Sequence, residues 1–292
     1  MRRALLLSFV LAGAACVPAD EAVALGSATF TVKASRAATA GFVTADRMND
    51  GTIGWNVVVD RVVLGFRTVT IGKVGDDDRC SFRGRGERSD VVFDPRTGLV
   101  QTFNGIQPAD CEDVGIFLAP PGDTTGVGPG ASPEDLFDLA ADPPAHAIVE
   151  ATARHHDESF RVRLRFDSTR TATRFGGCSA ATRGIRVRAN ERQVASMAFS
   201  PENLFRDALG FGSALRLTPF LEADENGDGD GVATMQEIDA LPLARLRGFG
   251  DFYQLPNGTI AGSFGDYLRA LFRFTFIYRD SGACFGNEPG SE

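Results

Sequence analysis

The sequence has few of the residues on which most enzyme signatures depend. It contains only three histidines in 292 residues, His146, His155 and His156. These cannot form the H-E-x-x-H zinc motif, and the chain has no G-x-S-x-G serine motif, no phosphate-binding glycine loop and no C-x-x-C pair. These absences exclude the enzyme classes that are recognised by those motifs. A hydrolase with two dispersed carboxylates needs no local signature, so that class stays open.

Lysine is almost missing, and the balance of charge is acidic. Lys33 and Lys73 are the only lysines, and the net charge is −8. An acidic chain has no general attraction for nucleic acid or for anionic lipid, so we expect no nucleic-acid partner. Apolar residues make up 43% of the chain and charged residues only 23%, which is typical of a folded protein with a real core.

The N-terminus has a short apolar run instead of a membrane span. Met1-Arg2-Arg3 is basic, and residues 4–15 are apolar up to Cys16, well below the ~20 residues of a spanning helix. This pattern resembles a bacterial lipoprotein signal. The resemblance implies that residues 1–19 form the signal region and that Cys16 is lipidated. The protein would then be an envelope lipoprotein of the outer membrane or periplasm, touching the membrane only through its anchor. The alternative is cleavage after Val17-Pro18-Ala19, which leaves a secreted protein.

Four further cysteines fit an exported protein. An even number in an oxidising compartment suggests two disulfides, with three connectivities open. Proximity along the chain favours the pairs Cys80–Cys111 and Cys178–Cys284.

Residues 28–118 are predicted to be a β-sandwich-like domain. Apolar residues alternate from Ile53 to Val59, shift to even positions from Val62 to Phe66, and return to odd positions at Val69. A strand cannot change the face it buries without an extra residue or a turn. We therefore expect bends, as irregularities of the strand, near Asp60-Arg61 and Arg67-Thr68.

Residues 119–136 are predicted to be a Pro/Gly-rich linker, and 137–286 a second β-rich domain. Ser132-Pro133-Glu134-Asp135 has the serine, proline and acids of a helix start. Residues 147–154 and 160–167 alternate as a hairpin, and 263–274 have helical spacing. The fold class we predict is mainly β with some α: two β-sandwich-like regions, the second carrying a helix-loop-helix insertion.

The hairpin carries arginines and histidines with two interpretations each. Arg161, Arg163 and Arg165 project to one side of the strand, where they form either an anion-binding face, with Arg186 and Arg188 beside them, or a solvated face balanced by acids. The segment His155-His156-Asp157 could supply metal ligands or form a turn. We favour the turn, because neighbouring strand residues point to opposite faces and rarely share one ion.

Residues 226–237, NGDGDGVATMQE, begin with three oxygen-bearing side chains at every second position. Asn226, Asp228 and Asp230 are followed by Gly231, where a sharp turn is needed, and Glu237 stands at the twelfth position. Residues 217–223 and 235–241 are predicted to be short flanking helices. The pattern resembles the calcium loop of the EF-hand family, over about thirty residues. The alternative is an acidic glycine-rich turn that binds no ion.

The EF-hand resemblance implies calcium as the cofactor and a set of oxygen ligands. These are Asn226, Asp228, Asp230, the carbonyl of Val232, Thr234 and Glu237, with Asp224 as an additional ligand. Asn226 stands where the family has aspartate, and Ala233 where it has a branched apolar residue. The sequence has no second loop, which favours a structural role over a regulatory one.

Our leading hypothesis is therefore an exported, non-catalytic calcium-binding envelope lipoprotein that binds a protein or glycan partner. The alternatives are a secreted hydrolase with dispersed carboxylates and a structural envelope component.

Overall fold

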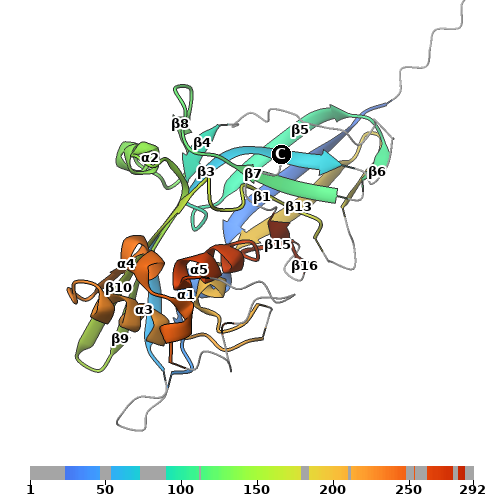
Figure 1. The fold of residues 1–292 in the computed structure, drawn as a ribbon. Helices are drawn as coiled ribbons and strands as arrows, with labels where there is room; N and C mark the ends of the chain where they lie inside the picture. The colour runs from blue at the N-terminus through green and yellow to red at the C-terminus, as the bar shows by residue number, and fades with distance from the viewer. Residues whose placement is uncertain are drawn as a thin grey trace, which may run out of the picture.

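The computed structural model describes residues 24–46, 54–72, 90–111, 113–178, 184–209, 212–247, 253, 262–278 and 282–286. Within this part of the chain, most of the regular structure is β-sheet, with several short helices (Figure 1). The prediction of a mainly β protein with some α-helix is confirmed. The signal region 1–19, Cys16 and Cys80 lie outside the described residues. Within these ranges, none of the helices has the length and apolarity to span a lipid bilayer.

The smaller of the two main sheets has the strand order β16-β15-β13-β1-β5. Strands β1 and β13 are parallel, and the other neighbours are antiparallel. The bounds are β1 Gly26–Ala34, β5 Leu99–Ile106, β13 Arg192–Phe199, β15 Phe276–Tyr278 and β16 Gly282–Ala283.

The larger sheet has the main order β14-β10-β9-β3-β7-β11-β17, with β2, β4 and β8 paired beside this path. Its strands are β2 Phe42–Val43, β3 Asn56–Gly72, β4 Val91–Phe93, β7 Asp113–Leu118, β8 Gly126–Val127, β9 Ala145–His155, β10 Glu158–Asp167, β11 Arg174–Gly176, β14 Val232–Thr234 and β17 Phe285–Gly286. A separate two-stranded sheet joins β6 Ala109–Cys111 and β12 Ile185–Val187.

Both main sheets contain strands from before and after residues 119–136. In the smaller sheet β1 pairs with β13, and in the larger sheet β3 pairs with β9. One cluster of buried side chains runs through both sets of strands. The predicted linker therefore connects strands that belong to the same sheets. The strand pairings do not divide the described residues into two separate sandwich-like regions. Hydrophobic alternation predicts which face of a strand is buried but carries no information about which distant strand lies beside it.

Strand β3 is one continuous strand with two bulges. The pairing register shifts between Val59 and Arg61 and again between Phe66 and Thr68. Each shift inserts one extra residue, which lets the strand keep its apolar side chains in the core after the change of face. The irregularities predicted at these two places are confirmed. At the first bulge, Arg96 donates to the carbonyls of Val59 and Asp60.

The helices are short, and most begin with a side-chain cap. They are α1 Arg36–Ala40, α2 Pro133–Ala140, α3 Thr218–Asn226, α4 Met235–Ala240 and α5 Phe264–Phe272, with 3-10 turns at Pro201–Phe205 and Leu243–Arg245. Ser132 and Ser263 form capping boxes at the starts of α2 and α5. The helices predicted at these two starts are confirmed. Figure 1 shows α3, α4 and α5 grouped beside the long β9–β10 hairpin.

Candidate metal centre

The acidic loop lies between α3 and α4, as its flanking sequence predicts. Its backbone folds around Asp224, in the last turns of α3. The N–H groups of Gly227 and Gly229 donate to the Asp224 carbonyl, at 2.9 and 3.0 Å. The N–H of Gly231 donates to the Asp224 carboxylate at 3.1 Å. Gly229 and Gly231 have φ of 70° and 83°, which glycine adopts without strain.

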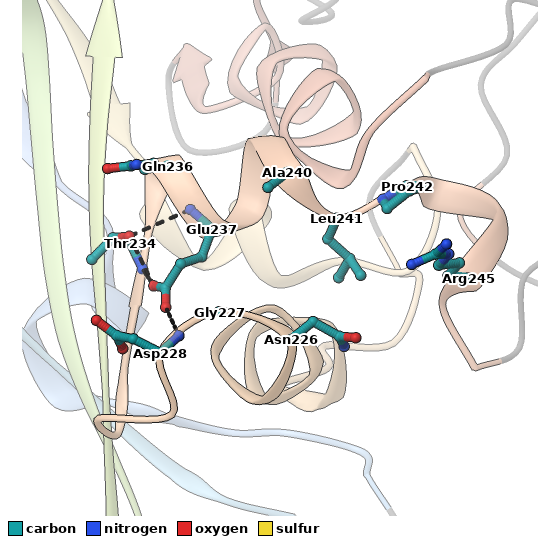
Figure 2. A pocket seen from close by; sticks show the side chains of 10 residues that line it. All are labelled: Asn226, Gly227, Asp228, Thr234, Gln236, Glu237, Ala240, Leu241, Pro242 and Arg245. Carbon is teal, nitrogen blue, oxygen red and sulfur yellow. Dashed lines mark hydrogen bonds between the residues drawn. The ribbon is translucent and has the colours of Figure 1, made fainter.

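Three carboxylates converge inside this loop. Asp224, Asp228 and Glu237 each offer an oxygen, and these oxygens all lie within 4.8 Å of one another. Asp224 is buried, Glu237 is half-buried and Asp228 is exposed. Figure 2 shows Glu237 reaching from α4 toward the backbone of Asp228. Three carboxylates this close repel one another unless a cation or a proton is shared among them.

Glu237 is held in place by hydrogen bonds to both of its oxygens. Oε2 accepts from the N–H and the hydroxyl of Thr234, both at 2.8 Å, and Oε1 accepts from the Asp228 N–H at 3.2 Å. Partial burial disfavours the charged form, but the bonds from Thr234 and Asp228 hold the pKa of Glu237 below its usual range. A carboxylate stabilised in its charged form suits a cation ligand and is a poor general acid.

Of the other predicted ligands, Asp230 is not part of this group of three carboxylates, and the side chains of Asn226 and Thr234 make hydrogen bonds of their own. The Asn226 amide donates to the Glu222 carbonyl within α3, at 2.6 Å, and points away from Glu237 in Figure 2. The Asp230 carboxylate accepts from the Val232 N–H at 2.9 Å. The Thr234 hydroxyl bonds Glu237 as its helix cap. Asp224, predicted only as an additional ligand, takes the central place because α3 continues through Asn226.

The loop is attached to the larger sheet through β14. Its residues Val232, Ala233 and Thr234 pair in parallel with Arg161, Val162 and Arg163 of β10. Ala233 is fully buried at this contact. The short alanine side chain fits where the loop backbone lies directly against the sheet. The β14 side of the loop is thus held by main-chain pairing with β10.

A pocket of about 500 Å³ opens beside Asp228 and Glu237, between α3 and α4. Its other walls are Leu241, Pro242 and the polar side chains of Asn226, Gln236 and Arg245. Figure 2 shows Asn226 and Arg245 at the end away from Asp228. The pocket therefore combines an acidic end with amide and guanidinium donors.

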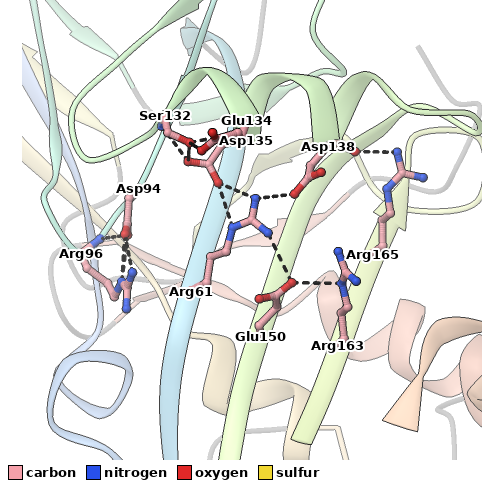
Figure 3. Close-up of polar contacts among 10 residues, drawn as sticks. All are labelled: Arg61, Asp94, Arg96, Ser132, Glu134, Asp135, Asp138, Glu150, Arg163 and Arg165. Atoms are coloured by element: carbon pink, nitrogen blue, oxygen red, sulfur yellow. Dashed lines mark hydrogen bonds and ion pairs between the residues drawn. The ribbon is translucent and has the colours of Figure 1, made fainter. Parts of the chain in front are cut away.

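The hairpin residues Arg163 and Arg165 form an ion pair and hydrogen bonds with other groups of the protein. Glu150 accepts from Arg163 and Arg61, and Arg61 also binds Asp135 and Asp138 of α2 (Figure 3). Arg165 donates to the carbonyls of Asp138 and Leu139, at the end of α2. Arg186 lies in the two-stranded sheet, where it pairs with Asp110. The structure thus favours the interpretation of a face balanced by acids.

The histidines at the hairpin turn lie closer together than expected. His155 and His156 pack edge to face, with ring centroids 4.3 Å apart. His156 has a φ of 50°, which turns its side chain off the strand direction and onto its neighbour. The prediction of a turn is confirmed, because His155 and Glu158 are paired across it. The expectation that the two side chains point apart is wrong.

Cys178 and Cys284 form a disulfide that links residues 106 apart in sequence. This pairing, one of those open in the sequence, is confirmed. Cys111 is also disulfide-bonded. The predicted partner of Cys111, Cys80, lies outside the described residues, so that pairing stays a prediction.

Comparisons of the chain with family models, curated proteins and solved structures return no match. The interpretation of the loop therefore depends on its residue spacing and its geometry.

Proposed function

We propose that the protein is an exported, non-catalytic calcium-binding lipoprotein of a bacterial envelope, in which calcium has a structural role. The observation that carries the proposal is the convergence of Asp224, Asp228 and Glu237 in a loop whose spacing resembles an EF-hand. Calcium prefers carboxylate and carbonyl oxygens, and this group offers only oxygens. An affinity of order 10⁻⁴–10⁻³ M suffices outside the cytoplasm.

A structural role follows from what the loop connects. It joins α3 to α4 and supplies β14, which pairs with β10 of the larger sheet. A cation would relieve the repulsion among the three carboxylates and hold these elements together. A ligand bound only by the folded state stabilises it, by about 1.8 kcal/mol when its concentration is twenty times the Kd.

The partner we propose is a glycan or another protein. The pocket beside the carboxylates supports a polar ligand, because Asn226, Gln236 and Arg245 supply hydrogen-bond donors over the apolar Leu241 and Pro242. A sugar ring presents such a combination of hydroxyl edges and apolar faces. A pull-down with immobilised glycans and with envelope extract, run with and without calcium, tests this part of the proposal.

Calcium binding is tested by isothermal titration of the purified protein. We expect one site and a higher melting temperature with calcium than with chelator. Asp228→Asn and Glu237→Gln should abolish binding. Asp230→Asn is the matched control, because it removes a nearby charge whose carboxylate lies outside the group of three, and it should weaken binding by less than tenfold.

Two results would contradict the proposal. One is wild-type protein whose melting is the same in calcium and in chelator. The other is a titration in which Asp230→Asn abolishes binding while Asp228→Asn leaves it intact, since that would place the ion elsewhere.

A further inference from the structure

His146 is a titratable side chain in an apolar place, far along the chain from the calcium loop. It lies on β9, is fully buried, and its two ring nitrogens have no hydrogen-bond partner of ordinary geometry within the described residues. A buried polar group without a partner is costly, and a buried charge is more so. His146 is therefore tolerated only as the neutral imidazole.

The ring lies where the end of α5 meets the sheets. Its centroid is 5.5 Å from that of Phe272, the last residue of α5. Phe272 also packs on Phe166 of β10 at 4.3 Å and on Phe175 of β11 at 5.6 Å. It reaches Phe199 of the smaller sheet at 6.2 Å. A positive charge on His146 would arise beside the side chain that joins α5 to both sheets.

The groups around His146 do little to accommodate that charge. Burial lowers the pKa of His146 to about 4, against the opposing influence of the Asp167 carboxylate and the Ala172 backbone. Asp167, at the end of β10, is itself hydrogen-bonded by Thr169 and Arg170. The neighbouring strand β3 contributes Gly65, which has no side chain, and α5 contributes the Phe272 ring. Asp167 is thus the one charged group among the described residues that we find acting on the ring.

We propose that His146 is an acid-sensitive element that loosens the packing of α5 against the sheets when the pH falls. The inference does not depend on calcium binding. Protonation of the ring in the folded state would place a charge among phenylalanines that Asp167 and the Ala172 backbone offset only in part, whereas the unfolded chain exposes the ring to water. Acid therefore favours the states in which α5 has moved off the sheet.

The direction of the effect follows from proton linkage. The ring takes up its proton at about pH 6.5 in the unfolded chain and at about pH 4 in the folded protein. The stability that His146 contributes is therefore complete above pH 6.5 and is lost as the pH falls through this window. Between pH 7 and pH 5 the folding equilibrium constant should fall about 20-fold through this residue.

A second buried group works in the opposite direction. Burial raises the pKa of Glu202, despite the hydrogen bond from Ser35. Its folded form takes up a proton more readily than the unfolded chain, so mild acid stabilises the protein through Glu202. The effect of His146 is therefore measured as a difference between variants at each pH.

The test is urea unfolding of the full chain between pH 7 and pH 5, with chelator present to remove any contribution of calcium. Wild type should lose about 20-fold in its folding constant relative to His146→Phe, which keeps an aromatic ring and removes the titration. His156→Gln, at the exposed hairpin turn, is the matched control and should follow wild type. His146→Leu serves if the phenylalanine variant does not fold.

NMR titration of the wild-type histidines gives an independent result. We expect the His146 ring signal to stay at its neutral position down to pH 5 in the folded protein. A His146 signal that moves with a midpoint near pH 6.5 would overturn the proposal. So would a His146→Phe or His146→Leu variant whose stability depends on pH as steeply as that of wild type.

Discussion

Gly227 shows how tightly the candidate calcium site is packed at the level of one residue. A Cβ atom at this position would collide with the Glu237 carboxylate. The φ of Gly227 is negative, at −91°, so left-handed strain is not the reason for glycine here, whereas steric contact with Glu237 is one. The residue after α3 is thus small because the Glu237 side chain from α4 lies against it.

Gly227→Ala should therefore weaken calcium binding without removing any charge. Displacing Glu237 from Asp224 and Asp228 should raise the Kd at least tenfold in isothermal titration. The matched control is Gly229→Ala, whose Cβ has open space around it. Because Gly229 has a φ of 70°, an alanine there should lower the free energy of unfolding by about 1 kcal/mol. The substitution should leave the three carboxylates in place. Equal affinities for Gly227→Ala and wild type would contradict this account of the site.

The sequence predicts the loop and only part of the ligand group. Spacing alone identifies Asp228 and Glu237, because the turn at Gly231 and the glutamate six residues later fix their places. Spacing could not show that α3 continues through Asn226, which turns this side chain toward Glu222 and brings Asp224 in its place. The sequence did contain a sign of this, because Asp224 stands two residues before Asn226 and extends the same alternating pattern by one acidic residue.

At the scale of elements, α3 depends on a distant residue for its N-terminus. Leu217, the residue at the N-cap of α3, makes no side-chain capping hydrogen bond. Instead the buried Asp46 accepts from the N–H of Leu217 at 2.7 Å, and from the N–H and hydroxyl of Thr218 at 3.3 and 2.7 Å. A carboxylate also interacts favourably with the positive end of the helix. The segment before β3 thus holds the start of α3, the helix that leads into the acidic loop.

Asp46→Ala should lower the free energy of unfolding by about 1–2 kcal/mol, because two buried N–H groups lose their acceptor. Urea unfolding in the presence of chelator measures this loss apart from calcium. Asp46→Asn keeps one acceptor oxygen and should recover part of the stability. An alanine variant as stable as wild type would show that α3 does not need this cap.

Element boundaries were predictable where a local signal exists, and strand partners were not. The changes of phase along residues 53–69 predicted the two places where β3 is irregular, and the structure shows that a bulge, not a turn, makes each change. The serine and proline at Ser132-Pro133 predicted α2. The contact of β14 with β10 had no such signal, because main-chain pairing of Ala233 with Val162 leaves no pattern in either segment.

At the scale of the whole molecule, the Cys178–Cys284 disulfide ties the end of the described chain to its middle. Cys178 follows β11, and Cys284 lies between β16 and β17. Both cysteines are buried. Closing a loop of about a hundred residues removes conformational freedom mainly from the unfolded chain.

The double variant Cys178→Ala/Cys284→Ala should therefore be less stable by about 2–5 kcal/mol in urea unfolding under oxidising conditions. The difference between this variant and wild type should largely vanish when both are unfolded in reducing buffer. A variant that unfolds at the same urea concentration as oxidised wild type would show that the bond contributes nothing.

The parallel pairing of β1 with β13 sets the order in which the chain can reach its final shape. Thr29 lies opposite Val194, and Ala34 opposite Phe199. During synthesis, β1 has no such neighbour until β13, which begins at Arg192, has also left the ribosome. Such long-range partners make folding slow, because the closing of large loops precedes the contacts that reward it. Until β13 has been made, the main-chain groups on one edge of β1 in the nascent protein are therefore free to pair with a strand other than β13.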